Sequence, residues 1–303
     1  MAMSHRPTAI DPSTRTLAGM TLTRRTILTG MGVAALLGAR ANAADDPIRF
    51  GLTPVFLDSD IELLAGLELY LSRRLDHPVT LVHRRTYQEI TALLLSDQLD
   101  AAWICGFPFV QHPTELALVA VPVWRGKPLY QSYLIVNKAV SATEINDLRG
   151  TVHAFSDPDS NSGFLVTRYL LARMRERPES FFSRFFFTYG HRNVVRAVGA
   201  GLAQSGSVDG YIWEVINELE PKLTAGTRII RKSEFLGFPP IACSVRLASR
   251  PRVRALGDVL VSMNQDEEGR KLLATLHLDG FAREDASLFD RIAEMYRAVQ
   301  AQS

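Results

Sequence analysis

Short apolar runs alternate with stretches of helical periodicity along most of this chain. Ile48–Leu52, Val79–Val82 and Ala101–Ile104 have the length of buried strands. Between them, Asp58–Leu75 and Tyr87–Leu95 carry apolar residues at helical spacing. The stripe expected to face the core from the first of these helices consists of Ile61, Leu64, Leu67, Leu71 and Leu75. This alternation predicts βα units that form a largely parallel sheet covered by helices.

The alternation continues along the chain and falls into two sets. Further strands are expected at Val119–Val123, Leu134–Val136, Val152–Phe155, Phe185–Phe187, Gly210–Ile212 and Ile241–Val245. Further helices are expected at Gly163–Arg175, His191–Leu202, Pro251–Asn264 and Ala286–Val299. Two α/β sets of similar size predict two lobes with a cleft between them. Because open α/β sheets bind ligands at the carboxyl ends of their strands, the strand-to-helix junctions are the first places to search for a site.

The first 43 residues have the order of an export signal. Arg24-Arg25 precedes a short apolar stretch, Gly30–Ala39, and Ala41-Asn42-Ala43 has the small-residue pattern of a cleavage site. Paired arginines indicate the twin-arginine route, so we expect cleavage after Ala43 and a location in the bacterial periplasm. A basic tail on a cytosolic protein is the alternative.

Composition narrows the class of protein. The chain has 303 residues, 47% hydrophobic and 22% charged, which excludes a disordered chain or a coiled coil. Its excess positive charge lies in the first 43 residues, which hold five of the 34 basic side chains and one of the 32 acidic ones. The remainder has no basic stripe with interleaved aromatics, so we expect no nucleic-acid partner. No apolar run reaches the roughly 20 residues of a membrane-spanning helix, so we expect no stable membrane insertion.

The junction between Phe155 and Phe164 is the strongest candidate for an anion site. A strand is expected to end at Phe155, and Ser160, Asn161 and Ser162 stand where a helix begins. The first N–H groups of a helix have no internal partner, and they lie at the positive end of the helix dipole. Together with the hydroxyls they predict a donor-rich cup for an oxyanion. A simple N-cap role for one of the serines is the alternative.

Three further polar side chains occupy comparable places. His191 begins the helix that follows the Phe-rich strand, where it would donate to an anion at the same cleft edge. Tyr87 begins a helix of the first set, and Tyr130 precedes the strand that leads into the second set. Each tyrosine would offer a hydroxyl donor while its ring excludes water, or else be ordinary core.

Cys105 stands between a buried strand and a helix start. There, the helix dipole would lower the pKa of a thiol. An inert buried thiol and a disulfide to Cys243, on the strand that returns to the first lobe, are equally open.

Known catalytic patterns are absent from the sequence. It has no G-x-S-x-G, H-E-x-x-H or Walker A pattern, and His83, His112 and His191 are not spaced as metal ligands. We therefore expect a non-catalytic binding protein with no cofactor and no metal. A hydrolase or transferase on the same scaffold is the alternative.

Several segments resemble the phosphate, phosphite and phosphonate-binding proteins of ABC importers. They are Asp157–Phe164 (DPDSNSGF), Gly190-His191, RTYQEI around Tyr87, Leu99–Trp103 (LDAAW) and Leu134–Lys138 (LIVNK). The resemblance implies an α/β, two-lobed type II periplasmic-binding-protein fold with two hinge crossings. It places the outgoing crossing at Leu134–Val136 and the return crossing at Ile241–Val245.

The expected organisation follows from this resemblance. Residues 1–43 are the signal peptide, residues 44–137 and 243–303 form lobe 1, and residues 138–242 form lobe 2. The resemblance implies that a small oxyanion is held by Tyr87, Tyr130, Ser160, Asn161, Ser162 and His191. The expected partner is an ABC permease.

Three departures from the family pattern bear on the ligand. Leu236–Pro240 has no carboxylate where phosphonate binders place an Asp for a ligand amine, which argues against an aminoalkylphosphonate. Asn161 replaces the usual Thr, and Cys105 stands where Gly is common. A cysteine there resembles the arsenite-binding branch of the family, whose members signal to a sensor histidine kinase. Arsenic ligation by Cys105, with the periplasmic domain of such a kinase as partner, is therefore the alternative.

Overall fold

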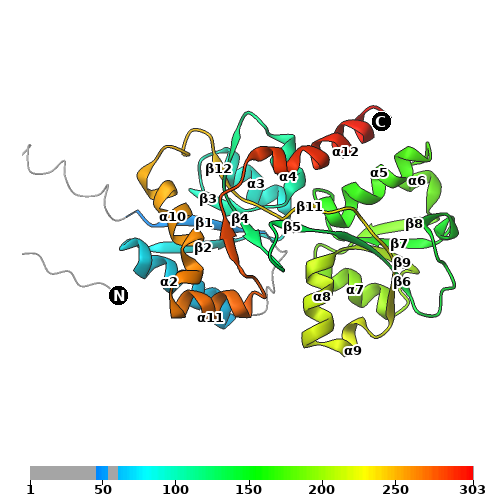
Figure 1. The fold of residues 1–303 in the computed structure, drawn as a ribbon. Helices are drawn as coiled ribbons and strands as arrows, with labels where there is room; N and C mark the ends of the chain where they lie inside the picture. The colour runs from blue at the N-terminus through cyan, green and yellow to red at the C-terminus, as the bar shows by residue number, and fades with distance from the viewer. Residues whose placement is uncertain (1–45, 54–60, 303) are drawn as a thin grey trace, which may run out of the picture. The chain divides into compact units, whose positions relative to one another are not determined.

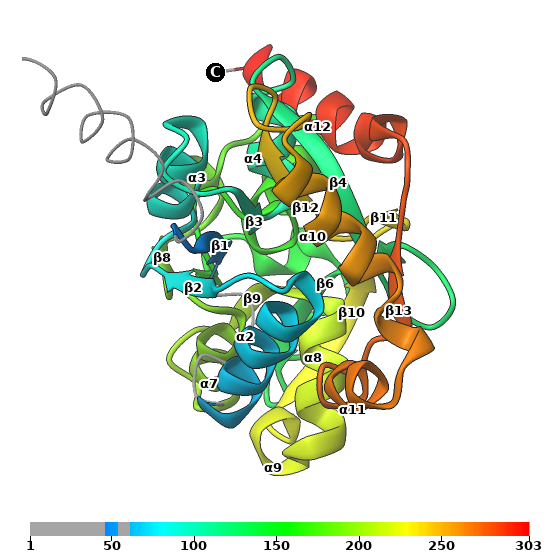
Figure 2. The ribbon, with the colours of Figure 1, turned by 90° about the vertical axis from the view of Figure 1, so that its left-hand side faces the viewer.

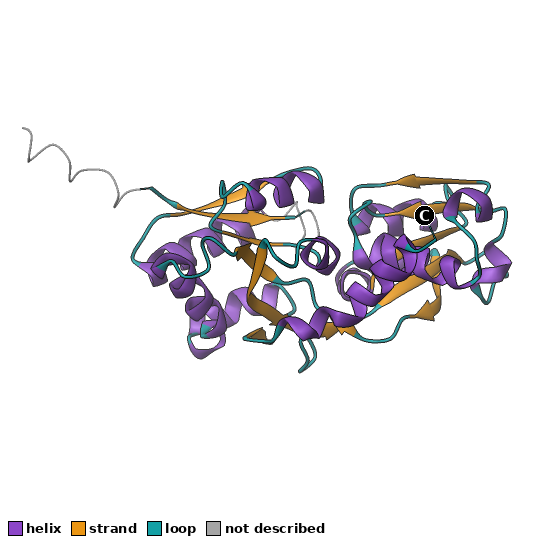
Figure 3. Ribbon diagram, turned by 90° about the horizontal axis from the view of Figure 1, so that it is seen from above, coloured by secondary structure: helices purple, strands orange, loops and turns teal. Residues whose placement is uncertain are grey.

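The computed structural model describes residues 46–53 and 61–302. The expected signal peptide and the first residues of the predicted helix Asp58–Leu75 lie outside this part of the chain. Pro47–Ser303 forms one compact unit, in which helices pack around two separate sheets (Figures 1 and 3). We call each sheet with its helices a lobe.

The sheet of the first lobe has six strands in the order β13-β4-β12-β3-β1-β2. β1 runs parallel to β2 and β3, whereas β12 and β13 are antiparallel to their neighbours. The strands are β1 (Ile48–Leu52), β2 (Val79–His83), β3 (Ala101–Trp103), β4 (Leu116–Val123), β12 (Ile241–Ser244) and β13 (Gly280–Ala282). The parallel βα order that the sequence predicts for the start of the chain is therefore present.

Five helices surround this sheet. They are α2 (Ile61–Leu75), α3 (Tyr87–Leu95), α4 (Gly106–Gln111), α10 (Pro251–Val261) and α11 (Glu267–Thr275). The last helix, α12 (Asp290–Gln300), packs against both α4 and α5 (Val166–Arg173) of the second lobe. α2 packs against α10 and α11 (Figure 2), and α3 packs on β1, β3 and β12. The buried residues of α2 are Leu63, Leu67, Tyr70 and Leu71, and Ile61 is 79% exposed. The predicted stripe was thus partly wrong, because Ile61 faces solvent and Leu63 is more deeply buried than Leu64, which packs at the edge of the core.

The sheet of the second lobe has five strands in the order β10-β6-β9-β7-β8. They are β6 (Ser132–Asn137), β7 (Val152–Phe155), β8 (Arg184–Phe187), β9 (Ser205–Asp209) and β10 (Thr227–Lys232). Around them lie α5 (Val166–Arg173), α6 (Pro178–Phe181), α7 (His191–Gly199), α8 (Gly210–Leu219) and α9 (Pro221–Thr224). Short 3₁₀ turns lie at Ile145–Leu148, Met263–Gln265 and Ala286–Phe289.

Two connections join the lobes, and they pair with each other. β5 (Leu129–Tyr130) is antiparallel to β11 (Leu236–Gly237) in a two-stranded sheet. The expected crossings at Leu134–Val136 and Ile241–Val245 were both wrong. Leu134–Val136 pairs with β9 and β10 inside the second sheet, and Ile241–Ser244 pairs with β3 and β4 inside the first. The outgoing connection precedes β6 and the return connection precedes β12.

One predicted strand is a helix. Gly210–Ile212 forms the first turn of α8, and the strand before it is Ser205–Asp209. That strand reads SGSVD and has only one large apolar residue, although every residue in it is buried. Hydrophobic patterning therefore identified the apolar start of the helix instead of the strand. Asp209 is the N-cap of α8, and its side chain accepts from the N–H groups of Tyr211 and Ile212.

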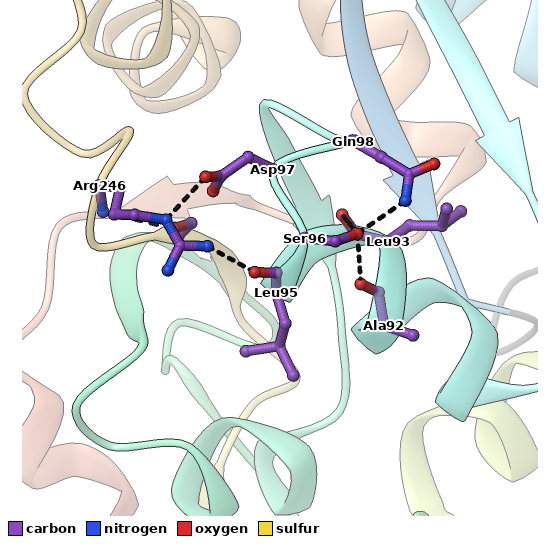
Figure 4. A network of polar contacts seen from close by, with 8 residues as sticks. Ala92, Leu93, Leu95, Ser96, Asp97, Gln98 and Arg246 are labelled. Atoms are coloured by element: carbon purple, nitrogen blue, oxygen red, sulfur yellow. Dashed lines mark hydrogen bonds and ion pairs between the residues drawn. The ribbon is translucent and has the colours of Figure 1, made fainter.

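Both ends of α3 are held by polar contacts. At its start, Thr86 and Glu89 form a capping box. Past its end, Arg246 Nε donates to Asp97 Oδ2 at 2.7 Å and Ser96 Oγ donates to Ala92 O at 2.8 Å (Figure 4). These contacts fix the helix that begins with Tyr87.

In the described part of the chain, every helix is too short or too polar to serve as a membrane span.

Candidate functional site

The seven residues expected to bind a ligand come from five segments and are all buried. Tyr87 begins α3, Cys105 precedes α4, Tyr130 lies in β5 and His191 begins α7. Ser160, Asn161 and Ser162 lie together after β7. The exposed fraction of each is 3% or less. Residues separated by up to 104 positions in sequence are thus brought to the place where the two lobes meet.

Four contacts connect these residues across the lobes and the hinge. The Tyr87 hydroxyl lies 3.4 Å from His191 Nε2, and the Tyr87 N–H points to Asp157 Oδ2 at 3.4 Å. The N–H of Asn161 donates to Cys105 Sγ at 3.1 Å. The Asn161 amide nitrogen donates to the Tyr130 hydroxyl at 2.9 Å. The structure therefore holds the lobes closed on one another.

The helix expected at Gly163–Arg175 starts as a wider turn. Asn161–Leu165 is a π-helical turn, and α5 follows from Val166. Ser160 is its N-cap, and its Oγ accepts from the N–H of Gly163 at 2.9 Å. A π turn often marks a functional position, because it widens the backbone at one point.

Gly163 permits this turn to pack against its own strand. A Cβ added at Gly163 would lie 1.8 Å from Ser156 Oγ and 2.9 Å from Ser160 Oγ. The Ser160 hydroxyl therefore faces Gly163 and caps the turn. Ser162 Oγ and Asn161 Oδ1, in contrast, make no hydrogen bond of ordinary geometry among the described residues, although Ser162 lies close enough to the Tyr130 hydroxyl to act on its pKa. Buried polar atoms of this kind are expected to have partners, so these two are available to a ligand.

The hydrogen bonds of His191 define its tautomer. The N–H of Asp209 donates to His191 Nδ1 at 3.1 Å, which makes Nδ1 an acceptor. Burial lowers the pKa of His191 to about 3, so the ring is neutral and carries its proton on Nε2. Nε2 then donates on the side of the Tyr87 hydroxyl. His191 is thus positioned as a neutral donor.

Of the three interpretations of Cys105 that the sequence left open, the acidic thiol is wrong and the inert buried thiol fits the structure. Burial raises the pKa of Cys105 to about 12, although the N–H groups of Phe107 and Asn161 act in the opposite direction. The loss of hydration raises the pKa of the thiol by more than the helix N-terminus lowers it, because a thiolate at this position would lose its water. The disulfide alternative is also excluded, because Cys105 and Cys243 are both free.

Sequence reasoning missed Asp209. This residue is 1% exposed, contacts His191 through its N–H, and contributes negative charge near Tyr87, Cys105 and Tyr130. Burial raises its pKa to about 7. An Asp directly before a helix is typical of an N-cap, and this pattern could have identified Asp209. It was overlooked because a strand was predicted at Gly210–Ile212, where the helix begins.

An outer depression lies beside the start of α3, and none of the seven expected ligand residues is among those that line it. It has a volume of about 920 Å³ and is lined by residues of both lobes, among them Arg84, Arg85 and Thr86 of the first and Thr188 and Tyr189 of the second. Thr86 directly precedes Tyr87. In the described part of the chain, no three His, Cys, Asp or Glu side chains gather as a set of metal ligands.

Known structures share this fold. A binding protein component of an ABC phosphonate transporter from Pseudomonas aeruginosa aligns with a TM-score of 0.77 and 22% identity over 85% of this chain and 88% of its own. PhnD1 from Prochlorococcus marinus, in complex with methylphosphonate, aligns with a TM-score of 0.74 and 18% identity over 84% and 98%. A Xanthomonas citri protein bound to chloride has a TM-score of 0.67 and 17% identity over 84% and 98%. At such identities the likeness shows the fold.

The family model described as "ABC transporter, phosphonate, periplasmic substrate-binding protein" matches residues 50–289, from β1 to the turn before α12. The match includes every residue of the candidate site and both connections between the lobes. This chain therefore belongs to the family of periplasmic substrate-binding proteins of phosphonate ABC transporters.

Proposed function

We propose that this protein captures a small oxyanion of the phosphate, phosphite or phosphonate class between its two lobes and presents it to an ABC permease. The observation that carries the proposal is the buried cluster in which the Ser162 hydroxyl makes no hydrogen bond of ordinary geometry and lies beside the donor side chains of Tyr87, Tyr130 and His191. Family membership supports the ligand class and the transporter.

In this proposal the oxyanion is held by neutral donors. Tyr130 receives a hydrogen bond from the Asn161 amide, so the Tyr130 hydroxyl proton is free to donate. Ser162 Oγ and His191 Nε2 add two more donors. Ser160 caps the π turn, so it acts on the ligand through the position of its neighbours. Hydrogen bonds to a charged ligand are each worth about 1.5–3 kcal/mol, so a few donors suffice without a salt bridge.

Closure also requires motion between the lobes. We propose that the change takes place in residues 124–131 and 233–240, where the chain passes between the two sheets. Closure of this kind buries the ligand and forms a surface that a membrane partner recognises. The protein is proposed to release its ligand unchanged, so no turnover of methylphosphonate or a phosphate ester is expected.

Titration calorimetry with methylphosphonate, phosphite, phosphate and sulfate tests the ligand class. We expect the phosphorus oxyanions to bind, and Tyr130→Phe to weaken the binding. Thr114→Ala, which changes an exposed hydroxyl paired only with Glu115, should leave it unchanged. No heat of binding from any of the three phosphorus oxyanions would overturn the proposal.

A second candidate function is arsenite sensing through Cys105, with a histidine kinase domain as partner. The observation that favours it is the position of Cys105 Sγ, 3.1 Å from Asn161 N inside the candidate site. Thiol sulfur is a soft ligand that suits trivalent arsenic. Arsenite binding in the presence of reductant that is abolished by Cys105→Ser and retained by Cys243→Ser would support this function. Equal binding before and after Cys105→Ser would exclude it.

We also propose that the protein reaches the periplasm by the twin-arginine route. Replacing Arg24-Arg25 by two lysines should leave the precursor in the cytoplasm, as seen by fractionation. Normal export of that variant would refute the route without affecting the ligand proposal.

A further inference from the structure

The outgoing connection contacts the π turn of the candidate site through two side chains. Tyr130 ends β5 and Ser132 begins β6, and residues two apart in extended chain point to the same side. The Tyr130 hydroxyl accepts from the Asn161 amide at 2.9 Å, and Ser132 Oγ donates to the carbonyl oxygen of Ser162 at 2.6 Å. Two consecutive residues of the turn are thus held by the connection.

The peptide group between Ser162 and Gly163 is held at both ends by serine hydroxyls. Its carbonyl oxygen accepts from Ser132 Oγ, and its N–H donates to Ser160 Oγ at 2.9 Å. The three serines are each 4% exposed or less. Because a peptide group is planar, hydrogen bonds at its two ends fix its orientation. The direction in which the Ser162 side chain leaves the backbone is constrained with it.

The two hydroxyls that hold this peptide come from different parts of the chain. Ser160 belongs to the turn itself and caps it. Ser132 comes from the outgoing connection, and its backbone pairs with Ser233 of the return connection. The Ser132 N–H donates to Ser233 Oγ at 2.9 Å, and the Ser233 N–H donates to the Ser132 carbonyl oxygen at 2.8 Å. Ser132 therefore ties the turn to both connections between the lobes.

The strand itself does not require a hydroxyl at this position. Ser132 lies opposite Asp209 of β9, in a ladder that backbone groups form. An alanine would make the same backbone hydrogen bonds and fit the same buried space, but it has no donor for the Ser162 carbonyl oxygen. The contact with the turn is therefore what distinguishes serine from alanine here.

We propose that Ser132 is a positioning residue of the ligand site: its hydroxyl orients the Ser162 peptide so that Ser162 Oγ faces the oxyanion. The inference rests on the proposed function and adds a residue that does not itself touch the ligand. Without this hydrogen bond, the carbonyl oxygen of Ser162 loses a buried partner, and the peptide is free to rotate toward another donor. The Ser162 hydroxyl then no longer points at the ligand.

A double-mutant cycle between Ser132 and Ser162 tests this role. Calorimetry of the full chain with methylphosphonate, or with phosphite if phosphite binds more tightly, measures Kd for wild type, Ser132→Ala, Ser162→Ala and the double variant. We expect Ser132→Ala to raise Kd about tenfold in the wild type. In the Ser162→Ala background it should raise Kd less than about twofold, because the hydroxyl that it positions is gone.

Ser205→Ala is the matched control. Ser205 is buried in the same sheet, and its Oγ contacts His153 Nδ1 at 2.7 Å instead of the turn. This variant should lower the free energy of unfolding, measured in urea, and leave Kd unchanged. If Ser132→Ala fails to fold, Ser132→Cys replaces it in the cycle, since a thiol is a much weaker donor of similar size.

Two results would overturn the inference and leave the proposed function standing. One is an unchanged Kd in Ser132→Ala, and the other is an equal rise in Kd with and without the Ser162 hydroxyl. The second result would mean that Ser132 acts on the stability of the lobe and not through Ser162. Failure of methylphosphonate, phosphite and phosphate to bind the wild type would overturn the proposed function itself.

Discussion

Cys105 of the first lobe and Asn161 of the second are in direct contact, with Sγ accepting a hydrogen bond from the backbone N–H at 3.1 Å. The contact joins the two lobes, and in this structure Cys105 is 3% exposed. The reactivity of the Cys105 thiol can therefore be used to measure closure of the lobes.

A ligand that stabilises the closed state should protect Cys105 from alkylation. If only the unliganded open form reacts, a ligand at 100 times its Kd slows the reaction about 100-fold. The measurement is the rate of iodoacetamide labelling of Cys243→Ala with and without methylphosphonate. The control is Cys105→Ala, whose remaining thiol lies inside the first sheet and should react at a rate independent of ligand. Equal protection of both thiols would point to global stabilisation instead of closure.

The two serines of the π turn should differ in what their loss affects. Ser162 Oγ makes no hydrogen bond of ordinary geometry among the described residues, so Ser162→Ala should weaken oxyanion binding by about 1–3 kcal/mol with little change in stability. Ser160 Oγ caps the turn, so Ser160→Ala should cost about 1 kcal/mol of the free energy of unfolding. Calorimetry and urea unfolding separate the two effects. If Ser160→Ala weakened binding and Ser162→Ala reduced stability instead, the capping hydroxyl would be that of Ser162 and the ligand-binding one that of Ser160.

Gly163→Ala should destabilise the second lobe. Its Cβ would lie 1.8 Å from Ser156 Oγ, so the turn or the strand must shift, at a cost of about 1–3 kcal/mol. Urea unfolding measures the loss. Combining it with Ser156→Gly, which removes the clashing hydroxyl, should restore much of the stability. An unaltered midpoint in the single variant would contradict the packing described.

The pH dependence of stability should change when Asp209 is replaced by Asn. Burial raises the folded pKa of Asp209 to about 7, above the usual value of 3.8, so its buried charge destabilises the unliganded protein above pH 7 and this cost disappears toward pH 4. Burial lowers the folded pKa values of His153 and His191 to about 3, so their contribution is lost as pH falls below 6.5. The two effects oppose each other between about pH 4 and 6.5.

Asp209→Asn should therefore be more stable than wild type at about pH 8, and should lose stability more steeply between about pH 6.5 and 4. Urea unfolding at about pH 8, 6.5 and 4 measures both effects. Parallel curves for the two proteins would show that Asp209 is solvated in the free protein.

Tyr211, on α8, should help to hold the two lobes together. Its hydroxyl donates to Leu276 O of the first lobe, and its ring packs edge-on against Trp124 and Phe238 in the two connections. Tyr211→Phe keeps the ring and removes the interlobe hydrogen bond, worth about 0.5–1.5 kcal/mol. We expect a few-fold rise in Kd that appears in the dissociation rate by stopped flow. A change confined to the association rate would contradict a role in holding the closed state.

The sequence by itself determined the βα order of the first sheet, most of the second, and the cluster of junctions that would meet at one place. Periodicity carries this information because a strand or helix buried on one face must repeat its apolar residues at a fixed spacing. Periodicity did not identify the strand Ser205–Asp209, because its residues are mostly small and polar although all of them are buried. The burial of this strand is decided by tertiary packing and not by its own hydrophobicity.

Only the tertiary structure decided which polar groups are free. Ser160 and Ser162 look alike in sequence, but the close approach of Gly163 to β7 turns Ser160 into a cap and leaves the Ser162 hydroxyl without a hydrogen bond of ordinary geometry among the described residues. The pKa of Cys105 likewise depends on its burial by the opposite lobe, which no local pattern contains. Asp209 acquires its role in the same way, because desolvation and the hydrogen-bond supply of a closed site belong to the fold as a whole.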